Sequence, residues 1–223
     1  MVKFKIEEIQ YTIPERLTVG QWKNIVRWDF EHKAHWPRIL HEATGAPLEY
    51  LQNTEDDSLE LGIVFIASIM NARKEAKIKD FNEITFGEWI DLDVYLNWGV
   101  DKHIEGILEI LSPETTMADE AQWVIEKYTT WRTFTYKQYT KLFGLDEPQG
   151  DVEADGPKRD IAKSWYNVII SLANEDILNI DAVTEQPLKK AFNFMAWRKE
   201  KQLEEQHRQL QQKRKYDLQT NRR

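Results

Sequence analysis

The feature that most constrains the fold is a helical apolar pattern that stops abruptly near the C-terminus. Apolar residues recur every three or four positions from Trp165 to Ala173, and again from Val183 to Ala196. This spacing puts them on one face of a helix, so both segments should pack into a core. After Trp197 the sequence RKEKQLEEQHRQLQQKRKYDLQTNRR is almost entirely polar. We therefore expect a helix that begins in a core and ends as a charged rod in solvent.

Charge divides the chain at the same place. The net charge is −8, but residues 196–223 carry nine Lys/Arg and four Asp/Glu, which leaves −13 on the rest. An acidic body argues against nucleic acid as its partner. The basic end is suited instead to an acidic partner, either a different molecule or the acidic surface of another copy of the chain.

The rest of the sequence predicts a mainly α fold: a helical bundle-like domain with a short N-terminal β element and a long C-terminal charged helix. Residues 2–13 alternate in polarity, with a shift of one position at Glu7-Glu8 that predicts a bulge or tight turn. A strand needs a neighbour, which another subunit could supply. Capping-box spacing at Thr18/Gln21 and Thr85/Glu88 marks two helix starts.

Further helices are expected at 36–45, 59–76, 100–111, 118–142, 160–174 and 181–218. The second of these is apolar nearly all round and should therefore lie centrally. Ser112-Pro113-Glu114 has the composition of a helix start.

The chain is expected to divide into three regions. An N-terminal strand and α-helical body would span 1–143. The segment 144–160 is rich in Gly, Pro and acidic residues and is expected to be a loop or linker. A helical pair ending in the charged helix would span 161–223.

Motifs that carry chemistry are missing from the sequence. The nine Gly are scattered and form no phosphate-binding loop, and the absence of Cys excludes disulfides, thiolate metal sites and Cys nucleophiles. His32, His35 and His41 lie in a connector, where ordinary exposed or hydrogen-bonded histidines are expected. Asp91 and Asp93 should face apart on a helix. We expect no cofactor, no metal and no enzymatic activity, although an enzyme with a scattered site stays open.

Other patterns bear on location and on the charged end. The longest apolar region, Leu59 to Met70, is too short and too interrupted to span a membrane, and the first ten residues contain no signal-peptide core. Glu204 and His207 share a helical face but lie in the most hydrophilic segment, which favours a solvated surface over a metal site.

The charged end admits three functions besides a frayed helix end. A coiled coil would use Ala196, Leu203 and Leu210, but its companion positions are too polar for a strong seam. A nucleic-acid arm would use the basic clusters, although acidic residues are interleaved with them. Partner docking would use sparse apolar anchors with charged rims. The expected contact residues are Trp197, Arg198, Lys199, Lys201, Leu203, Leu210, Lys213, Arg214, Lys215 and Tyr216.

The run WYNVIISLANEDILNIDAVTEQPLKKAFNFMAWRKEK carries a family resemblance. Its aromatic helix, its polar turn through Leu172, Asn174 and Asp176, and its helix led by Pro187 resemble the C-terminal region of tail and baseplate assembly proteins of tailed bacteriophages, often called tail assembly chaperones. The segments IPERLTVGQW and ITFGEWIDLDVYL are similar to phage structural proteins.

The resemblance implies a non-enzymatic morphogenesis factor that binds a phage tail or baseplate protein. It would act in the cytoplasm of the infected bacterial host. The alternative in the same setting is a structural virion protein, such as a head-tail adaptor, ring or baseplate subunit, which could also form a homo-oligomer. A nucleic-acid-binding accessory protein is the more remote alternative.

Overall fold

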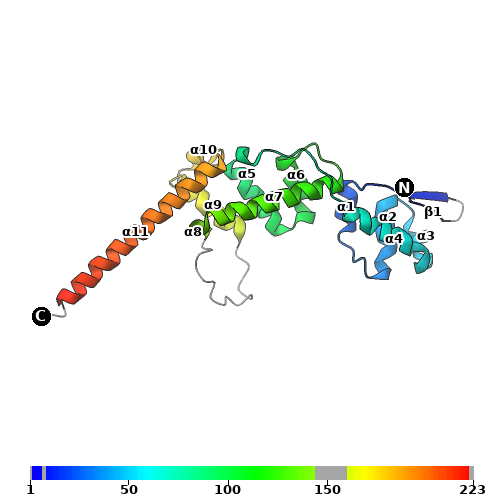
Figure 1. The fold of residues 1–223 in the computed structure, drawn as a ribbon, viewed down its shortest axis with the longest axis horizontal. Helices are drawn as coiled ribbons and strands as arrows, with labels where there is room; N and C mark the ends of the chain where they lie inside the picture. Colours follow the sequence, from blue (N-terminus) through cyan, green and yellow to red (C-terminus); the bar gives the residue numbers. More distant parts are fainter. Residues whose placement is uncertain (1, 7–8, 144–159, 221–223) are drawn as a thin grey trace. The chain divides into compact units, whose positions relative to one another are not determined.

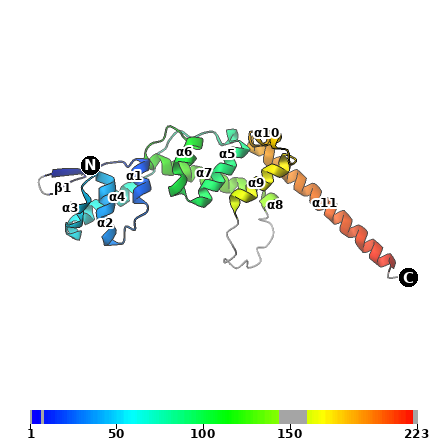
Figure 2. The ribbon, with the colours of Figure 1, turned by 180° about the vertical axis from the view of Figure 1, so that it is seen from behind.

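The computed structural model describes residues 2–6, 9–143 and 160–220, without the side chains of 2, 6, 56, 58 and 215–220 (Figures 1 and 2). It is mainly helical, with a two-stranded N-terminal sheet and a long C-terminal helix, as expected. The chain forms two compact units: unit 1 comprises 1–79 and 92–129, and unit 2 comprises 80–91 and 130–223. The expected linker lies outside the described residues except for Asp160, which caps a helix.

The N-terminal β element is a hairpin. Strand β1 (Val2–Ile6) pairs antiparallel with β2 (Ile9–Ile13), so that Ile6 lies opposite Ile9. The shift in polarity therefore separates two paired strands. Each half of the segment supplies the neighbour that the other half needs, and pairing with another subunit stays a prediction for the outer edges. Ile13 at the end of β2 is fully buried and attaches the hairpin to the core of unit 1.

Unit 1 is otherwise built from short helices: α1 (Val19–Ile25), α2 (Trp36–Thr44), α3 (Leu48–Gln52), α4 (Asp56–Met70) and α6 (Val100–Leu111). The first capping box is confirmed: Thr18 Oγ1 accepts from the Gln21 amide at 3.2 Å, and Gln21 Oε1 accepts from the Thr18 amide at 3.0 Å. Gly45, with φ 72°, ends α2 in the left-handed conformation that glycine tolerates best.

Helix α4 departs from its expected central position. One face is buried through Leu59, Ile63 and Ile66, but Leu61 and Val64 are exposed on the other. The helix also ends at Met70, six residues earlier than expected. An apolar pattern all round a helix therefore did not mean burial all round.

Helices α5 (Phe86–Trp98) and α7 (Ala118–Gln138) each contribute residues to both units. The expected helix start at Ser112 was wrong. The Ser112 amide donates to the Leu108 carbonyl at 2.7 Å, and its hydroxyl donates to the Lys77 carbonyl, so Ser112 ends α6. Helix α7 begins only at Ala118.

An ion-pair cluster joins the segment after the hairpin to α7. Arg16 Nε and Nη2 donate to Asp119 at 2.8 and 2.6 Å, and Nη2 also reaches Glu120 at 2.7 Å. Burial alone would raise the pKa of Asp119, but the hydrogen bonds and charge of Arg16 outweigh it and lower that pKa. Hydrogen bonds from Arg16 and then Lys74 likewise lower the pKa of Glu120.

Unit 2 contains α8 (Thr140–Phe143), α9 (Ile161–Leu172), the short η3 (Ile177–Asn179), α10 (Ile180–Thr184) and α11 (Leu188–Thr220). The expected helix over 118–142 breaks near Tyr139 into α7 and α8. The expected helix from Asp181 is also two helices. Between them, Gln186 and Leu188 form backbone hydrogen bonds with Phe86 and Ile84, and this pairing interrupts the helix.

Candidate protein-docking site

The first part of α11 belongs to the core of unit 2. Leu188, Ala191, Phe192 and Met195 are buried and recur at helical spacing. The Phe192 ring contacts the rings of Trp89, Tyr139 and Phe143, with centroids 5.2 to 5.4 Å apart, all edge-to-face. This aromatic cluster fixes the point from which the rest of the helix leaves unit 2.

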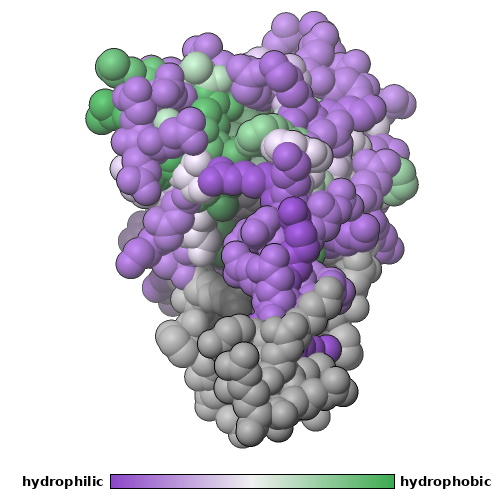
Figure 3. Space-filling model, turned by 90° about the vertical axis from the view of Figure 1, so that its left-hand side faces the viewer, coloured by the Kyte–Doolittle hydropathy of each residue, from purple (hydrophilic) through white to green (hydrophobic). Residues whose placement is uncertain are grey.

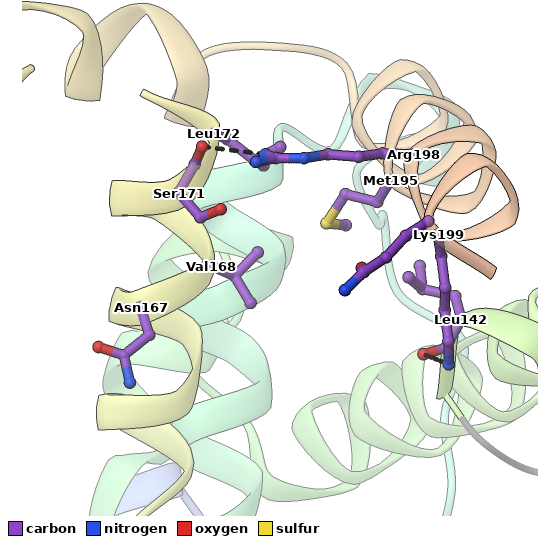
Figure 4. A pocket seen from close by; sticks show the side chains of 9 residues that line it. Leu142, Asn167, Val168, Ser171, Leu172, Met195, Arg198 and Lys199 are labelled. Carbon is purple, nitrogen blue, oxygen red and sulfur yellow. Dashed lines mark hydrogen bonds between the residues drawn. The ribbon is translucent and has the colours of Figure 1, made fainter. Parts of the chain in front are cut away.

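Arg198 and Lys199, which were expected to contact a partner, hold α11 to its own unit. Arg198 Nη1 donates to the Ser171 carbonyl in α9 at 3.0 Å, and Lys199 Nζ donates to the Leu142 carbonyl in α8 at 3.2 Å (Figure 4). Helix C-termini present unpaired carbonyls, and a cation satisfies them well. The positively charged end therefore begins with two tethering residues.

The rod, residues 201–214, follows these tethers. Every residue in it is exposed. Its side-chain contacts in the described part of the chain lie within the helix: Arg208 pairs with Glu205 at 3.1 Å, and Gln211 contacts His207 at 2.9 Å. Figures 1 and 2 both show this half of α11 extending past α8, α9 and α10. The rod is thus available for contacts that this chain does not make with itself.

The expected anchors do not form one stripe. Leu203 and Leu210 are both exposed and seven residues apart, so they share a face to within about 20°. Trp197 precedes Leu203 by six residues and lies about 120° away around the helix. It packs instead beside Phe194, with centroids 5.7 Å apart, and under Lys201 Nζ at 4.6 Å. The leucine stripe, Leu203 and Leu210, is therefore the apolar feature of the rod.

The remaining expected contact residues lie near the end of the rod. Lys213 and Arg214 are exposed and add two positive charges beyond the leucine stripe. Lys215 and Tyr216 are in α11, but their side chains lie outside the described residues.

A pocket of about 580 Å³ opens at the base of α11, between α8, α9 and α11 (Figure 4). Its apolar lining comes from Leu142, Val168, Leu172 and Met195; its polar lining comes from Asn167, Ser171, Arg198, Lys199 and Gln202. Sequence reasoning missed this pocket, because it assigned Val168 and Leu172 to a closed core. The signal that could have indicated it is a pair of cations, Arg198 and Lys199, one helical turn after the buried Met195.

The histidines and aspartates that the sequence singled out lie in different parts of the chain. His32 and His35 stack on each other at 4.8 Å, while His41 Nδ1 donates to the Ala46 carbonyl at 2.7 Å. Asp91 is exposed and Asp93 buried, which confirms that they face apart. Among the described residues, His, Asp and Glu form no group of three that could hold a metal ion.

The comparisons with other proteins leave the family open. Known protein families, curated proteins and solved structures were compared with this chain, and it matches none of them. Within the described part of the chain, each helix is too short or too polar to traverse a lipid bilayer.

Proposed function

We propose that this protein is a non-enzymatic assembly factor that binds a partner protein through the rod. The observation that carries the proposal is the contrast within α11: its first part is anchored in an aromatic core, and residues 201–214 are exposed throughout. Isolated helices of this length are marginal in water. Anchoring at one end supplies the helix nucleus, so the rod is already helical before a partner binds. Less conformational entropy is therefore lost on binding.

The chemistry of the rod favours an acidic, amphipathic partner. Burial of Leu203 and Leu210 would contribute about 1.5–3 kcal/mol each. Around them the rod has four Lys/Arg and two Glu, so acidic groups at the rim of the partner's groove would be complementary. A helix laid into a groove with anchors one heptad apart is a common mode of peptide recognition.

The resemblance to phage tail assembly chaperones suggests the partner. We propose a tail or baseplate protein, bound in the cytoplasm of the infected bacterial host and held until it assembles. Such components expose apolar surface before assembly, and an amphipathic rod could cover it.

A structural virion protein is the second candidate, and the hairpin favours it. In the described residues β1 and β2 form a two-stranded sheet, so each strand retains one edge that could pair with a neighbouring subunit. Mass spectrometry of purified virions separates the two functions: a chaperone is absent from the finished particle, whereas a structural subunit is present in fixed copy number.

The test removes residues 203–223, which keeps Arg198, Lys199 and Gln202 in place. Because residues 203–214, the part of the deleted segment whose side chains are described, are all exposed, the melting temperature should shift by no more than about 2 °C. Capture of co-expressed tail or baseplate proteins by the tagged chain should be lost. Leu203→Ser/Leu210→Ser should also abolish capture, while the matched surface variant Gln206→Ser/Gln209→Ser should not.

Two results would contradict the proposal. Unfolding of the truncated chain would show that the rod stabilises its own unit. Capture that persists without the leucines, and that weakens steeply with salt, would point instead to phosphate contacts by the basic residues.

A further inference from the structure

Two consecutive apolar side chains project from the turn between α9 and α10. Ile177 is 77% exposed and Leu178 is 84% exposed, in the short η3. We call this pair the apolar knob. Figure 3 shows that apolar surface on the viewed face gathers at one upper corner, with hydrophilic residues around it. Adjacent aliphatic side chains with this much exposure are unusual outside an interface.

The knob is held rigidly. Asp176 Oδ1 accepts from the Leu178 amide at 3.0 Å, and the Glu175 amide donates to the Ile170 carbonyl at 3.0 Å. Asn174 and Glu175 have φ of 55° and 62°, in the left-handed region that non-glycine residues rarely adopt. Strain of this kind persists only where surrounding bonds maintain it, and it is concentrated in functional segments. A fixed knob loses little entropy when it enters a pocket.

The knob and the pocket at the base of α11 are complementary in charge. Exposed acidic residues flank the knob in the sequence: Glu175 and Asp176 precede it, and Asp181 and Glu185 follow it. The pocket has an apolar lining, and Arg198 and Lys199 lie at its side (Figure 4). Arg198 and Lys199 each donate one hydrogen bond to a backbone carbonyl, and a guanidinium has five N–H donors and an ammonium three. Donors therefore remain for carboxylates that approach with the knob.

Size and placement fit as well. The pocket volume, about 580 Å³, lies within the range that receives whole small ligands, about 300–1,000 Å³. Leu172 lines the pocket, and the knob begins five residues later, so both features lie at the same end of α9. The knob is nonetheless exposed, so it does not fill the pocket of its own chain.

We propose that two copies of this chain form a reciprocal dimer in which the apolar knob of each enters the pocket of the other. A twofold axis beside the end of α9 repeats the same contact twice, which closes the assembly at two copies. The occupant of the pocket is therefore Ile177 and Leu178 of the second copy, with its acidic rim against Arg198 and Lys199.

Sedimentation velocity on the full chain, from low to high micromolar concentration, tests the proposal. The wild type should pass from monomer to dimer. Ile177→Ser/Leu178→Ser should stay monomeric, with the dissociation constant of the dimer raised at least tenfold. Ser171→Trp, which fills the pocket from an exposed position, should also stay monomeric. Leu203→Ser/Leu210→Ser should dimerise like the wild type, which separates this result from the function proposed for the rod.

Cross-linking gives a second measurement, because the chain has no cysteine. A mixture of Leu178→Cys and Ser171→Cys chains should form a disulfide-linked heterodimer under mild oxidation. A mixture of Leu61→Cys and Ser171→Cys should not, although Leu61 on α4 is 78% exposed. The proposal would be overturned if the wild type were monomeric at every concentration, or if the knob variant dimerised like the wild type. Either result would mean that the second copy does not occupy the pocket.

Discussion

Phe192 and Phe194 provide a matched test of how α11 is anchored. They are the same residue type, two positions apart on one helix, but Phe192 is fully buried and Phe194 is 50% exposed. Phe192 packs edge-to-face against rings from α5 and α8 and against Tyr139 between α7 and α8, whereas Phe194 contacts one ring, that of Trp197. Replacement of each by alanine should therefore have very different consequences.

The expected magnitudes follow from burial. Phe→Ala in a packed core costs about 3–5 kcal/mol, and the ring partners of Phe192 put it in the upper half of that range. Phe194→Ala removes a half-exposed side chain and one tilted ring pair, so its cost should be about 1 kcal/mol or less. The difference of about 3 kcal/mol corresponds to roughly 6–12 °C in melting temperature for a chain of this size.

Urea and thermal denaturation followed by far-ultraviolet circular dichroism would measure both losses. If the two units unfold separately, the loss should appear in only one transition. Phe192→Leu is the control, because it keeps apolar volume and should cost less than about 1.5 kcal/mol. Equal losses for Phe192→Ala and Phe194→Ala would refute the arrangement of α11, since they would mean that both faces of the helix are packed alike.

Three further predictions concern unit 1. Thr18→Ala removes the N-cap of α1 and should lower the free energy of unfolding by about 1 kcal/mol in urea titrations; an unchanged midpoint would contradict the capping box. Because Arg16 lowers the pKa of Asp119, the ion pair should contribute fully at neutral pH and be lost as pH falls below about 4 through the lowered pKa. Asp119→Asn should flatten this acid slope in pH-dependent melting, whereas an unchanged slope would assign it to other carboxylates. Gly62→Ala gains about 1 kcal/mol of helix propensity, but its Cβ would lie 2.8 Å from the buried Leu40 Cδ2. Overpacking costs about 1–3 kcal/mol, so a net loss of about 1 kcal/mol is expected, and a rise in melting temperature would count against the packing of α2 on α4.

The helix starts and stops that depend on consecutive residues were predicted correctly. The capping boxes at Thr18 and Thr85 and the glycine stop at Gly45 each depend on four or five consecutive residues, and all three are present. The exposed rod was likewise predictable, since a segment with only two leucines among polar residues has little to bury.

Distant contacts account for the errors. Ser112 has the composition of an N-cap, but its hydroxyl binds the Lys77 carbonyl from another segment, so it ends a helix. The continuous helix expected from Asp181 is interrupted because Gln186 and Leu188 pair with a backbone segment about a hundred residues earlier. The face of α4 that stays exposed is also set by the positions of its neighbours, which periodicity does not specify.

In the candidate site, too, some features follow from the sequence and others depend on contacts between distant residues. By itself, the sequence determined that α11 leaves a core near Trp197 and continues as a positively charged helix, because burial and charge are properties of residue type and spacing. Only the tertiary structure decided that Arg198 and Lys199 are tethers and that α8, α9 and α11 line a pocket at the same end of α9 as the apolar knob. The physical reason is that a cation or an apolar side chain is suited equally to its own chain and to a partner, and the nearest carbonyl or cavity in the folded chain decides between them.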